Sequence, residues 1–282
     1  MRLFLRQFRF ELLKLFSRPR TYLGFAGFLA FEILLLMLLQ RDDARLLVKK
    51  HMERAGYTFA DNFTGPTVAQ YTLDYTLTIL GALYLALIAG DIVSKEIEDG
   101  TMRMTLCSRT SRGRIFVLKF LACVFYTCVL TTFVAGSAML LGLAFEGTGN
   151  LFVFHDVESI AISYAFADGM MVYFFGALPL LMLSMFTVTA IAFMFSCLNV
   201  KPAAATVGAL GIFVVDNMLR SVPFFLKIRH WFITSRISAW AHIYDEQVPW
   251  KRLTNDYLTL LAIDAIAIGI GWWCFRRRDL KP

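Results

Sequence analysis

Six long apolar stretches alternate with polar and charged stretches along the 282 residues of the chain. An α-helix rises about 1.5 Å per residue, so about 20 apolar residues cross a hydrocarbon core of about 30 Å. The pattern therefore predicts an all-α integral membrane fold with six transmembrane helices in a single domain. The predicted spans are residues 22–39, 71–93, 115–145, 169–198, 203–219 and 257–275.

Residues 1–18 form a separate segment, in which residues 2–16 carry an amphipathic pattern. At 100° per residue, six apolar side chains fall within one arc that contains no polar residue, and the four basic side chains lie outside it. We expect a helix that lies in the headgroup plane with this arc facing the lipid. Pro19 separates this helix from the first span. The apolar residues are Phe4, Leu5, Phe8, Leu12, Leu15 and Phe16.

The first connection, residues 40–70, is polar and longer than a simple turn. Its segment 41–54 predicts a short helix. Gly56, Gly65 and Pro66 indicate turns before the second span begins.

The later connections differ in chemistry. Residues 146–168 contain no Lys or Arg but several aromatic residues, and we expect them to rest at the membrane interface. Pro179 predicts a kink within the fourth span, and the short link 199–202 predicts a tight hairpin between spans four and five. Residues 221–256 mix Phe and Trp with Lys and Arg, which is typical of re-entrant or interfacial helices near an aromatic belt.

The composition excludes several classes of protein. Hydrophobic residues make up 58% of the chain and charged residues 17%, against about 45–50% and 25% in soluble domains. No polar stretch reaches the roughly 50 residues of a soluble catalytic domain. The chain has no Gly-rich nucleotide-binding loop and no metal-binding histidine spacing. We therefore expect a non-catalytic subunit with no metal or cofactor of its own.

Basic residues indicate how the chain is oriented. With both termini in the cytoplasm, 17 of the 28 Lys and Arg residues fall on the cytoplasmic side. This bias follows the positive-inside rule and predicts cytoplasmic termini. The net charge of +7 thus belongs to the ends of the spans, where bases meet lipid headgroups, and does not indicate nucleic-acid binding.

The charged stretch between the second and third spans carries the most informative motif. It is acidic from Asp91 onward and basic toward its end, which predicts a short helix followed by a glycine turn. Its pattern resembles the first cytoplasmic loop of ABC-2-type transporter permeases, although Arg109 stands where that family usually has proline. The residues that carry the resemblance are Glu96, Gly100, Thr101, Leu106, Ser111, Arg112 and Lys119.

The resemblance implies a permease subunit of an ATP-binding-cassette exporter in a bacterial inner membrane. Two such chains, identical or pseudo-symmetric, would pair, and two separate ATPase subunits would bind ATP and Mg²⁺. Loop 94–113 would dock on the ATPase; the alternative is a solvated loop that only joins two spans. The implied coupling residues are Glu96, Gly100, Thr101, Arg112 and Lys119.

The same resemblance places a substrate path between the two chains, lined by spans one, two and five, with residues 221–256 as an external gate. The aromatic-rich apolar spans favour a hydrophobic or amphipathic substrate.

Three acidic residues interrupt the apolar runs: Glu32, Asp216 and Asp264. A charge within the bilayer is costly, so each should face a partner or a water-filled cavity. The three residues either line a substrate path or make structural hydrogen bonds between helices. They also support an alternative function, a proton-coupled carrier that works without an ATPase.

Overall fold

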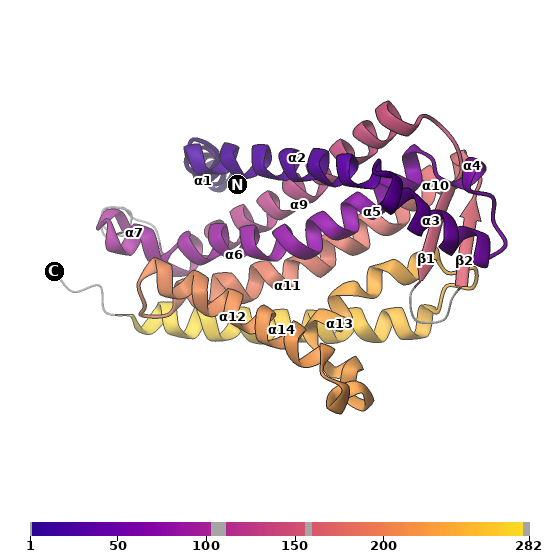
Figure 1. The fold of residues 1–282 in the computed structure, drawn as a ribbon. Helices are drawn as coiled ribbons and strands as arrows, with labels where there is room; N and C mark the ends of the chain where they lie inside the picture. Colours follow the sequence, from indigo (N-terminus) through magenta and orange to yellow (C-terminus); the bar gives the residue numbers. More distant parts are fainter. Residues whose placement is uncertain (1, 103–110, 156–159, 279–282) are drawn as a thin grey trace.

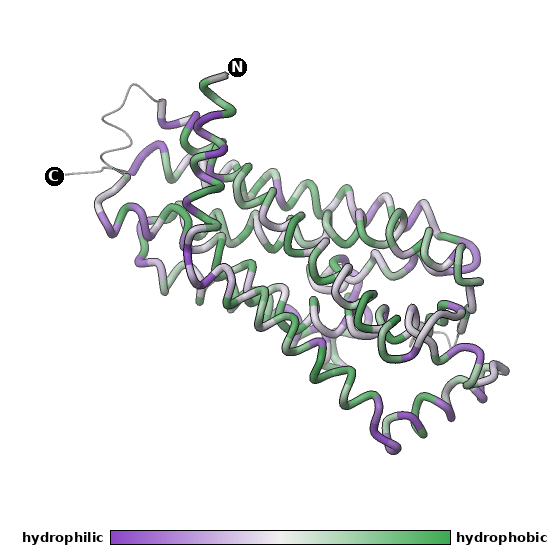
Figure 2. The backbone as a smooth tube through the Cα atoms, turned by 90° about the horizontal axis from the view of Figure 1, so that it is seen from above, coloured by the Kyte–Doolittle hydropathy of each residue, from purple (hydrophilic) through white to green (hydrophobic). Residues whose placement is uncertain are grey.

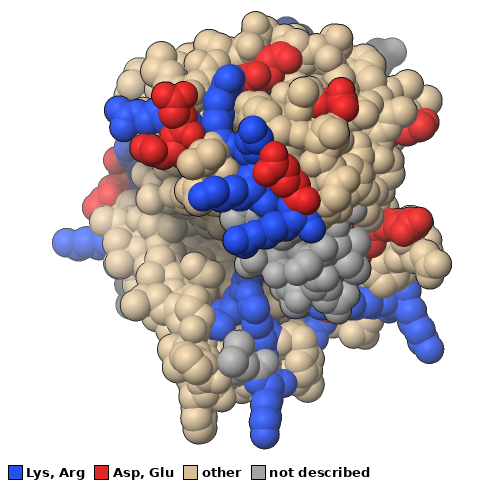
Figure 3. Space-filling model, turned by 45° about the vertical axis from the view of Figure 1, so that its right-hand side comes forward, with Lys and Arg blue, Asp and Glu red and all other residues tan. Residues whose placement is uncertain are grey.

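Six long helical segments run side by side as a bundle (Figure 1). The computed structural model describes residues 2–102, 111–155 and 160–278. Hydrophobic residues follow the length of the helices, and hydrophilic residues concentrate toward the two ends of the bundle (Figure 2). Figure 3 shows charged side chains gathered in groups, with wide uncharged areas between them. These observations confirm the predicted all-α membrane fold.

Four of the six segments are uninterrupted helices, and two contain a π-helical turn, labelled η1 and η2. The uninterrupted helices are α2 (Pro19–Leu39), α9 (Arg112–Glu146), α12 (Pro202–Ser221) and α14 (Trp250–Arg277). The second segment joins α5 (Gly65–Thr76), η1 (Leu77–Gly81), α6 (Ala82–Asp91) and α7 (Ser94–Glu98). The fourth joins α10 (Phe166–Met171), η2 (Val172–Ala177) and α11 (Leu178–Cys197).

The observed helices contain the predicted spans almost completely but extend beyond them. The second segment begins at Gly65 and the sixth at Trp250, earlier than the predicted Tyr71 and Tyr257. Gly65 and Pro66 are therefore not turn residues, because they form the first turn of α5. Proline fits that position well, since the first helical N–H groups have no acceptor within the helix. Hydropathy misses such extensions because their residues are more polar than those of the spans.

Helix α9 lies at the centre of the packing. It contacts α5, α11, α1 and α2, while α11 contacts α14, α6 and α12. Helices α5 and α9 cross closely at two glycines, since a Cβ atom on Gly142 would lie 2.4 Å from the Gly65 carbonyl oxygen. Small residues at such crossings let transmembrane backbones approach each other.

The N-terminal segment forms the predicted helix, α1 (Arg2–Phe16). Only part of its apolar arc remains available to lipid, because Phe8 and Phe16 pack against α9. The ring of Phe8 lies 6.2 Å from that of Phe125, and Phe16 lies 5.7 Å from Tyr126. Leu5, in contrast, is 57% exposed. Helix α1 is thus attached to the bundle as well as being amphipathic.

The end of the bundle away from α7 carries a cap of short elements (Figure 1). Residues 146–168 contain an antiparallel β-hairpin that the sequence interpretation missed: β1 (Leu151–His155) pairs with β2 (Ile160–Tyr164). The predicted helix over 41–54 is present as α3 (Asp42–Arg54), and α4 (Phe59–Asn62) follows it.

Pro179 falls in the first turn of α11, directly after the π-helical turn η2. A proline ring clashes with the carbonyl group four residues earlier in an α-helix. The wider π turn supplies space for the ring, so an irregular turn precedes the proline where the sequence predicts a kink.

The segment between α12 and α14 consists of short helices, as predicted. They are the 3₁₀ helix η3 (Pro223–Trp231), α13 (Ile233–Ile237) and the 3₁₀ helix η4 (Ser238–Tyr244). Helix α13 contacts α11, α12 and α14. Arg236 fastens α13 to α14 by an ion pair of 2.9 Å with Asp256.

Candidate functional site

The short helix α7 is held against the bundle at its start and ends at a glycine. Ser196 of α11 accepts hydrogen bonds from the N–H groups of Val93 (2.9 Å) and Ser94 (3.0 Å). Gly100 has a φ angle of +72°, a conformation that side-chain-bearing residues rarely adopt. The predicted short helix and glycine turn are therefore both present.

Glu96 and Lys119, which the sequence singled out separately, meet in a buried charge cluster with two residues of α1. Lys119 Nζ lies 2.8 Å from Glu96 Oε2 and 3.1 Å from Glu11 Oε2. Lys14 Nζ completes the cluster at 3.3 Å from Glu11 Oε1 and 3.6 Å from Glu96 Oε1. Two ammonium groups and two carboxylates thus alternate across α1, α7 and α9, and their formal charges cancel.

Burial makes this cluster consequential. The side chain of Lys119 is completely buried, and Glu96 is 6% exposed. A buried charge is tolerated only when it is paired. Burial tends to raise the pKa of the Glu11 carboxyl, but Lys119 and Lys14 outweigh it and lower that pKa below its ordinary value. The cluster therefore favours the ionised form of Glu11.

Thr101 and Arg112 hold the two described ends of the charged loop. The hydroxyl of Thr101 donates to the carbonyl oxygen of Glu96 at 3.2 Å. Arg112 donates to the carbonyl oxygens of Arg276 (3.1 Å) and Arg278 (3.0 Å) at the end of α14. Arg112, the first residue of α9, thus bonds to the C-terminal end of the sixth span and does not belong to the charge cluster. The motif positions Leu106 and Arg109 lie outside the described residues.

Sequence reasoning missed Glu11 and Lys14 as members of this site. The available signal was that Glu11 is the single acid among the first 31 residues. An acid in a basic interfacial helix indicates a specific partner, and Lys14 lies on the same helical face three residues later.

Glu32 lies on the buried face of α2, one turn from Phe28 and Leu36. It is completely buried and faces Ser137 of α9, whose hydroxyl instead donates to the Phe133 carbonyl at 2.9 Å. Neither carboxyl oxygen of Glu32 has a hydrogen-bond partner among the described residues. Glu32 therefore points into the bundle and away from lipid.

Asp216 has the contacts of a structural residue. Its carboxylate accepts hydrogen bonds from the N–H groups of Ile233 (3.2 Å) and Thr234 (2.7 Å), and from the Thr234 hydroxyl (2.6 Å). It thereby caps the first turn of α13 from the neighbouring helix α12. Its assignment to a substrate path stays a prediction.

Asp264 lies between α14 and α11 and is 8% exposed. It faces Thr187 of α11, one turn beyond a hydrogen bond of 3.1 Å between Ser184 and Tyr257. A polar line thus runs along this helix interface. Its role in a substrate path also stays a prediction.

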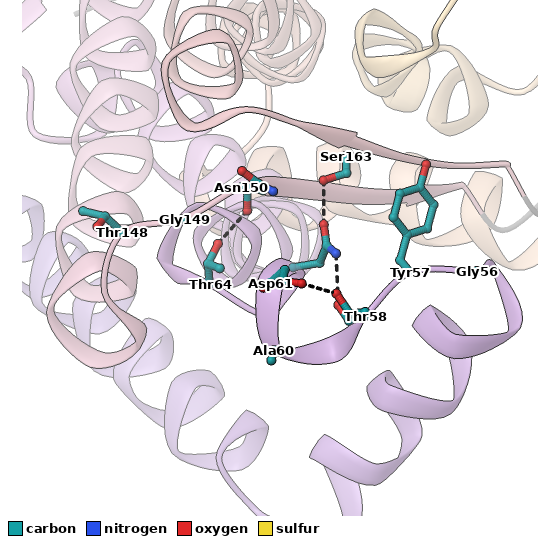
Figure 4. A pocket seen from close by; sticks show the side chains of 11 residues that line it. Gly56, Tyr57, Thr58, Ala60, Asp61, Thr64, Thr148, Gly149, Asn150 and Ser163 are labelled. Carbon is teal, nitrogen blue, oxygen red and sulfur yellow. Dashed lines mark hydrogen bonds between the residues drawn. The ribbon is translucent and has the colours of Figure 1, made fainter.

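A pocket of about 650 Å³ opens in the cap (Figure 4). Its polar side chains bond mainly to each other and to backbone: Thr64 donates to the Asn150 carbonyl at 2.6 Å, and Ser163 donates to Asn62 at 2.5 Å. Over the parts of the chain that the structure describes, no three His, Cys, Asp or Glu side chains are placed to hold a metal ion.

Comparison with known proteins agrees with the fold and with the motif. The profile of the family described as "ABC-2 family transporter protein" matches residues 24–222. This chain belongs to the ABC-2 transporter family. The match covers the first five spans and the whole charged loop, and it makes the chain a multi-pass transmembrane transporter subunit. ABC-2 permeases normally work with an ATPase subunit.

This ABC-2 protein is similar to two proteins from Bacillus subtilis (strain 168). The chain is 26% identical to the uncharacterized membrane protein YdbK over 272 residues, which is 95% of this chain and the whole of YdbK. It is 34% identical to the uncharacterized protein YhcI over 88 residues, which is 31% of this chain and 28% of YhcI. The match to YdbK thus extends beyond residues 24–222 to nearly the whole of this chain.

Proposed function

We propose that this ABC-2 protein is the permease subunit of an ATP-driven exporter and that a separate ATPase subunit drives it through loop 94–113. The charge cluster of Glu11, Lys14, Glu96 and Lys119 is the observation that carries the proposal. It connects the predicted docking helix α7 to two other helices through ion pairs in which Glu96 and Lys119 are buried.

Helix α7 has one face for the bundle and another for a partner. Ser94 and Glu96 are buried, whereas Glu98 and Asp99 are exposed. An ATPase surface bound to the exposed face would push on a helix whose other face is fixed. Because packed elements move as units, such a displacement passes to the helices attached to α7.

Three attachments receive that displacement. Ser196 connects the start of α7 to α11, Lys119 connects Glu96 to α9, and Glu11 connects Lys119 to α1. Helix α9 in turn contacts α5 and α2. Movement of α7 thus has a direct physical route into the first, second, third and fourth spans.

The remaining features of the proposal follow from the exposed helices and from the family. Helices α2 and α12 are each only 22% buried over their apolar windows, which leaves apolar faces for lipid, a second copy of the chain and a hydrophobic or amphipathic substrate. ATP and Mg²⁺ would bind to the ATPase, since this chain has no P-loop. Both termini would lie in the cytoplasm of the bacterial inner membrane.

The test replaces Glu96 by Gln in the full chain and purifies the permease with its copurifying ATPase. We expect the ATPase to remain bound, because Glu96 is buried, but its rate of ATP hydrolysis in proteoliposomes to depart from the wild-type rate. Glu53→Gln, on the exposed helix α3, is the matched control and should change neither quantity. Wild-type binding and hydrolysis in Glu96→Gln would refute the coupling role of α7.

A further inference from the structure

Helix lengths locate the segment that follows α12 at one membrane surface. Helix α12 has 20 residues and so rises about 30 Å, the thickness of a hydrocarbon core. It starts beside α7 and runs toward the cap (Figure 1), so by its length its far end reaches the depth of the opposite membrane surface. Helix α9, with 35 residues, rises about 52 Å and continues beyond that surface to the hairpin. The 3₁₀ helix η3 thus lies at the headgroup level of the leaflet on the hairpin side.

Large apolar side chains project from η3 away from the protein. Phe224 is 85% exposed and Trp231 is 71% exposed. The ring of Phe225 lies 5.1 Å from that of Phe224 and 6.1 Å from that of Phe232, so the aromatic residues of this segment pack against each other. Aromatic residues with this exposure at headgroup level are typical of membrane-interface anchors.

The segment that carries these aromatic residues is basic, and its nearest acids act on Arg220 alone among its three exposed or half-buried bases Arg220, Lys227 and Arg229. Residues 217–244 contain no Asp or Glu, and Asp216 is occupied by the start of α13. Among the described residues Arg220, Lys227 and Arg229 form no ion pair. Arg220 and Arg229 are close enough for their charges to repel each other, while Asp216 and Asp74 attract Arg220. Lys227 and Arg229, which no described acid pairs, are thus available to attract an anion.

We propose that η3 binds an anionic phospholipid of the hairpin-side leaflet. The headgroup phosphate lies among Arg220, Lys227 and Arg229, and the upper acyl chains lie beside Phe224 and Trp231. Basic side chains next to an apolar, interfacial surface suit this ligand, because the lipid provides both the phosphate and the apolar contact. The site is independent of the proposed transport function.

The test is native mass spectrometry of the full-length protein after detergent delipidation and addition of phosphatidylglycerol and phosphatidylcholine in equal amounts. We expect selective retention of phosphatidylglycerol. The double variant Lys227→Gln/Arg229→Gln should bind it roughly 10- to 30-fold more weakly, because two charges near the phosphate are lost. Lys227→Arg/Arg229→Lys keeps both charges and should retain the wild-type level.

The matched control is Lys49→Gln/Lys50→Gln, which removes two charges from exposed positions of α3 and should leave retention unchanged. Equal retention of both lipids by the wild-type protein would refute the proposal. So would wild-type retention in the Lys227→Gln/Arg229→Gln variant, or an equal loss in the α3 control. Complete displacement of phosphatidylglycerol by inorganic phosphate would assign the site to free phosphate and also overturn it.

Discussion

Removal of the buried ammonium group of Lys119 is the most direct perturbation of the charge cluster. In Lys119→Met the side chain stays unbranched and keeps most of its length, but the carboxylates of Glu11 and Glu96 lose a cation at 3.1 and 2.8 Å. At an effective dielectric constant of about 20, these attractions amount to about 5 and 6 kcal/mol before desolvation. Desolvation of the ammonium group opposes them, so the net loss on breaking a buried pair is about 3–5 kcal/mol.

The assay is the free energy of unfolding, measured by SDS titration in dodecylmaltoside micelles. We expect Lys119→Met to lower it by about 3–5 kcal/mol, whereas Lys50→Met on the exposed face of α3 should change it by less than about 0.5 kcal/mol. Adding Glu96→Gln to Lys119→Met should cost less than the sum of the single changes, because Glu96 has already lost its nearest cation and keeps only Lys14 at 3.6 Å. A loss below about 1 kcal/mol in Lys119→Met, or additive effects in the double variant, would refute the reasoning.

Three further predictions concern Glu11, Asp216 and Glu32. The pKa of Glu11 in the folded protein lies below its ordinary value of 4.5, so its ionised form stabilises the fold above that pH, and this contribution disappears as the pH falls through the lowered pKa. Glu11→Gln should therefore reduce the change in the free energy of unfolding between pH 7 and 3. The control Asp43→Asn, at an exposed position, should leave that change unaltered. Asp216→Ala removes three hydrogen bonds from the start of α13 and should cost about 1–3 kcal/mol in the same SDS titration, against little for Ala at the exposed Asn217; equal costs would contradict the capping role. Glu32→Gln should preserve the rate of ATP hydrolysis by the permease–ATPase complex when the proton gradient is collapsed. Transport that strictly requires both the gradient and Glu32 would instead favour the proton-coupled carrier.

The spans were predictable because a helix that crosses the hydrocarbon core needs a long run of apolar residues, which hydropathy detects. Each apolar run corresponds to one observed segment, and the short helix with its turn at Gly100 followed from charge order and glycine. The start of α5 at Gly65 was not predictable in this way. That turn of helix packs against α9 and Gly142 in the cap, where contacts between helices stabilise it and lipid does not.

The hairpin and the charge cluster show what local pattern leaves out. Strands β1 and β2 are short, and the composition of residues 146–168 predicts only a position at the membrane interface. The strand signal there is that Leu151 to Phe154 is rich in aromatic and β-branched residues. Glu96 and Lys119 were singled out by a motif, but their contact depends on how α7 folds back beside α9. The participation of Glu11 depends in addition on the docking of α1, which no spacing within α1 specifies.

The π turn η1 has a consequence for how one span serves two sets of neighbours. A single additional residue rotates everything beyond it by roughly 100° about the helix axis. Before that turn α5 packs against α9, and after it α6 packs against α11 and α12. Deleting one residue from Leu77–Gly81 would preserve the hydropathy profile yet misalign one half of the rod with its partners. The second span is thus one continuous helix whose two halves present their packing surfaces in different directions.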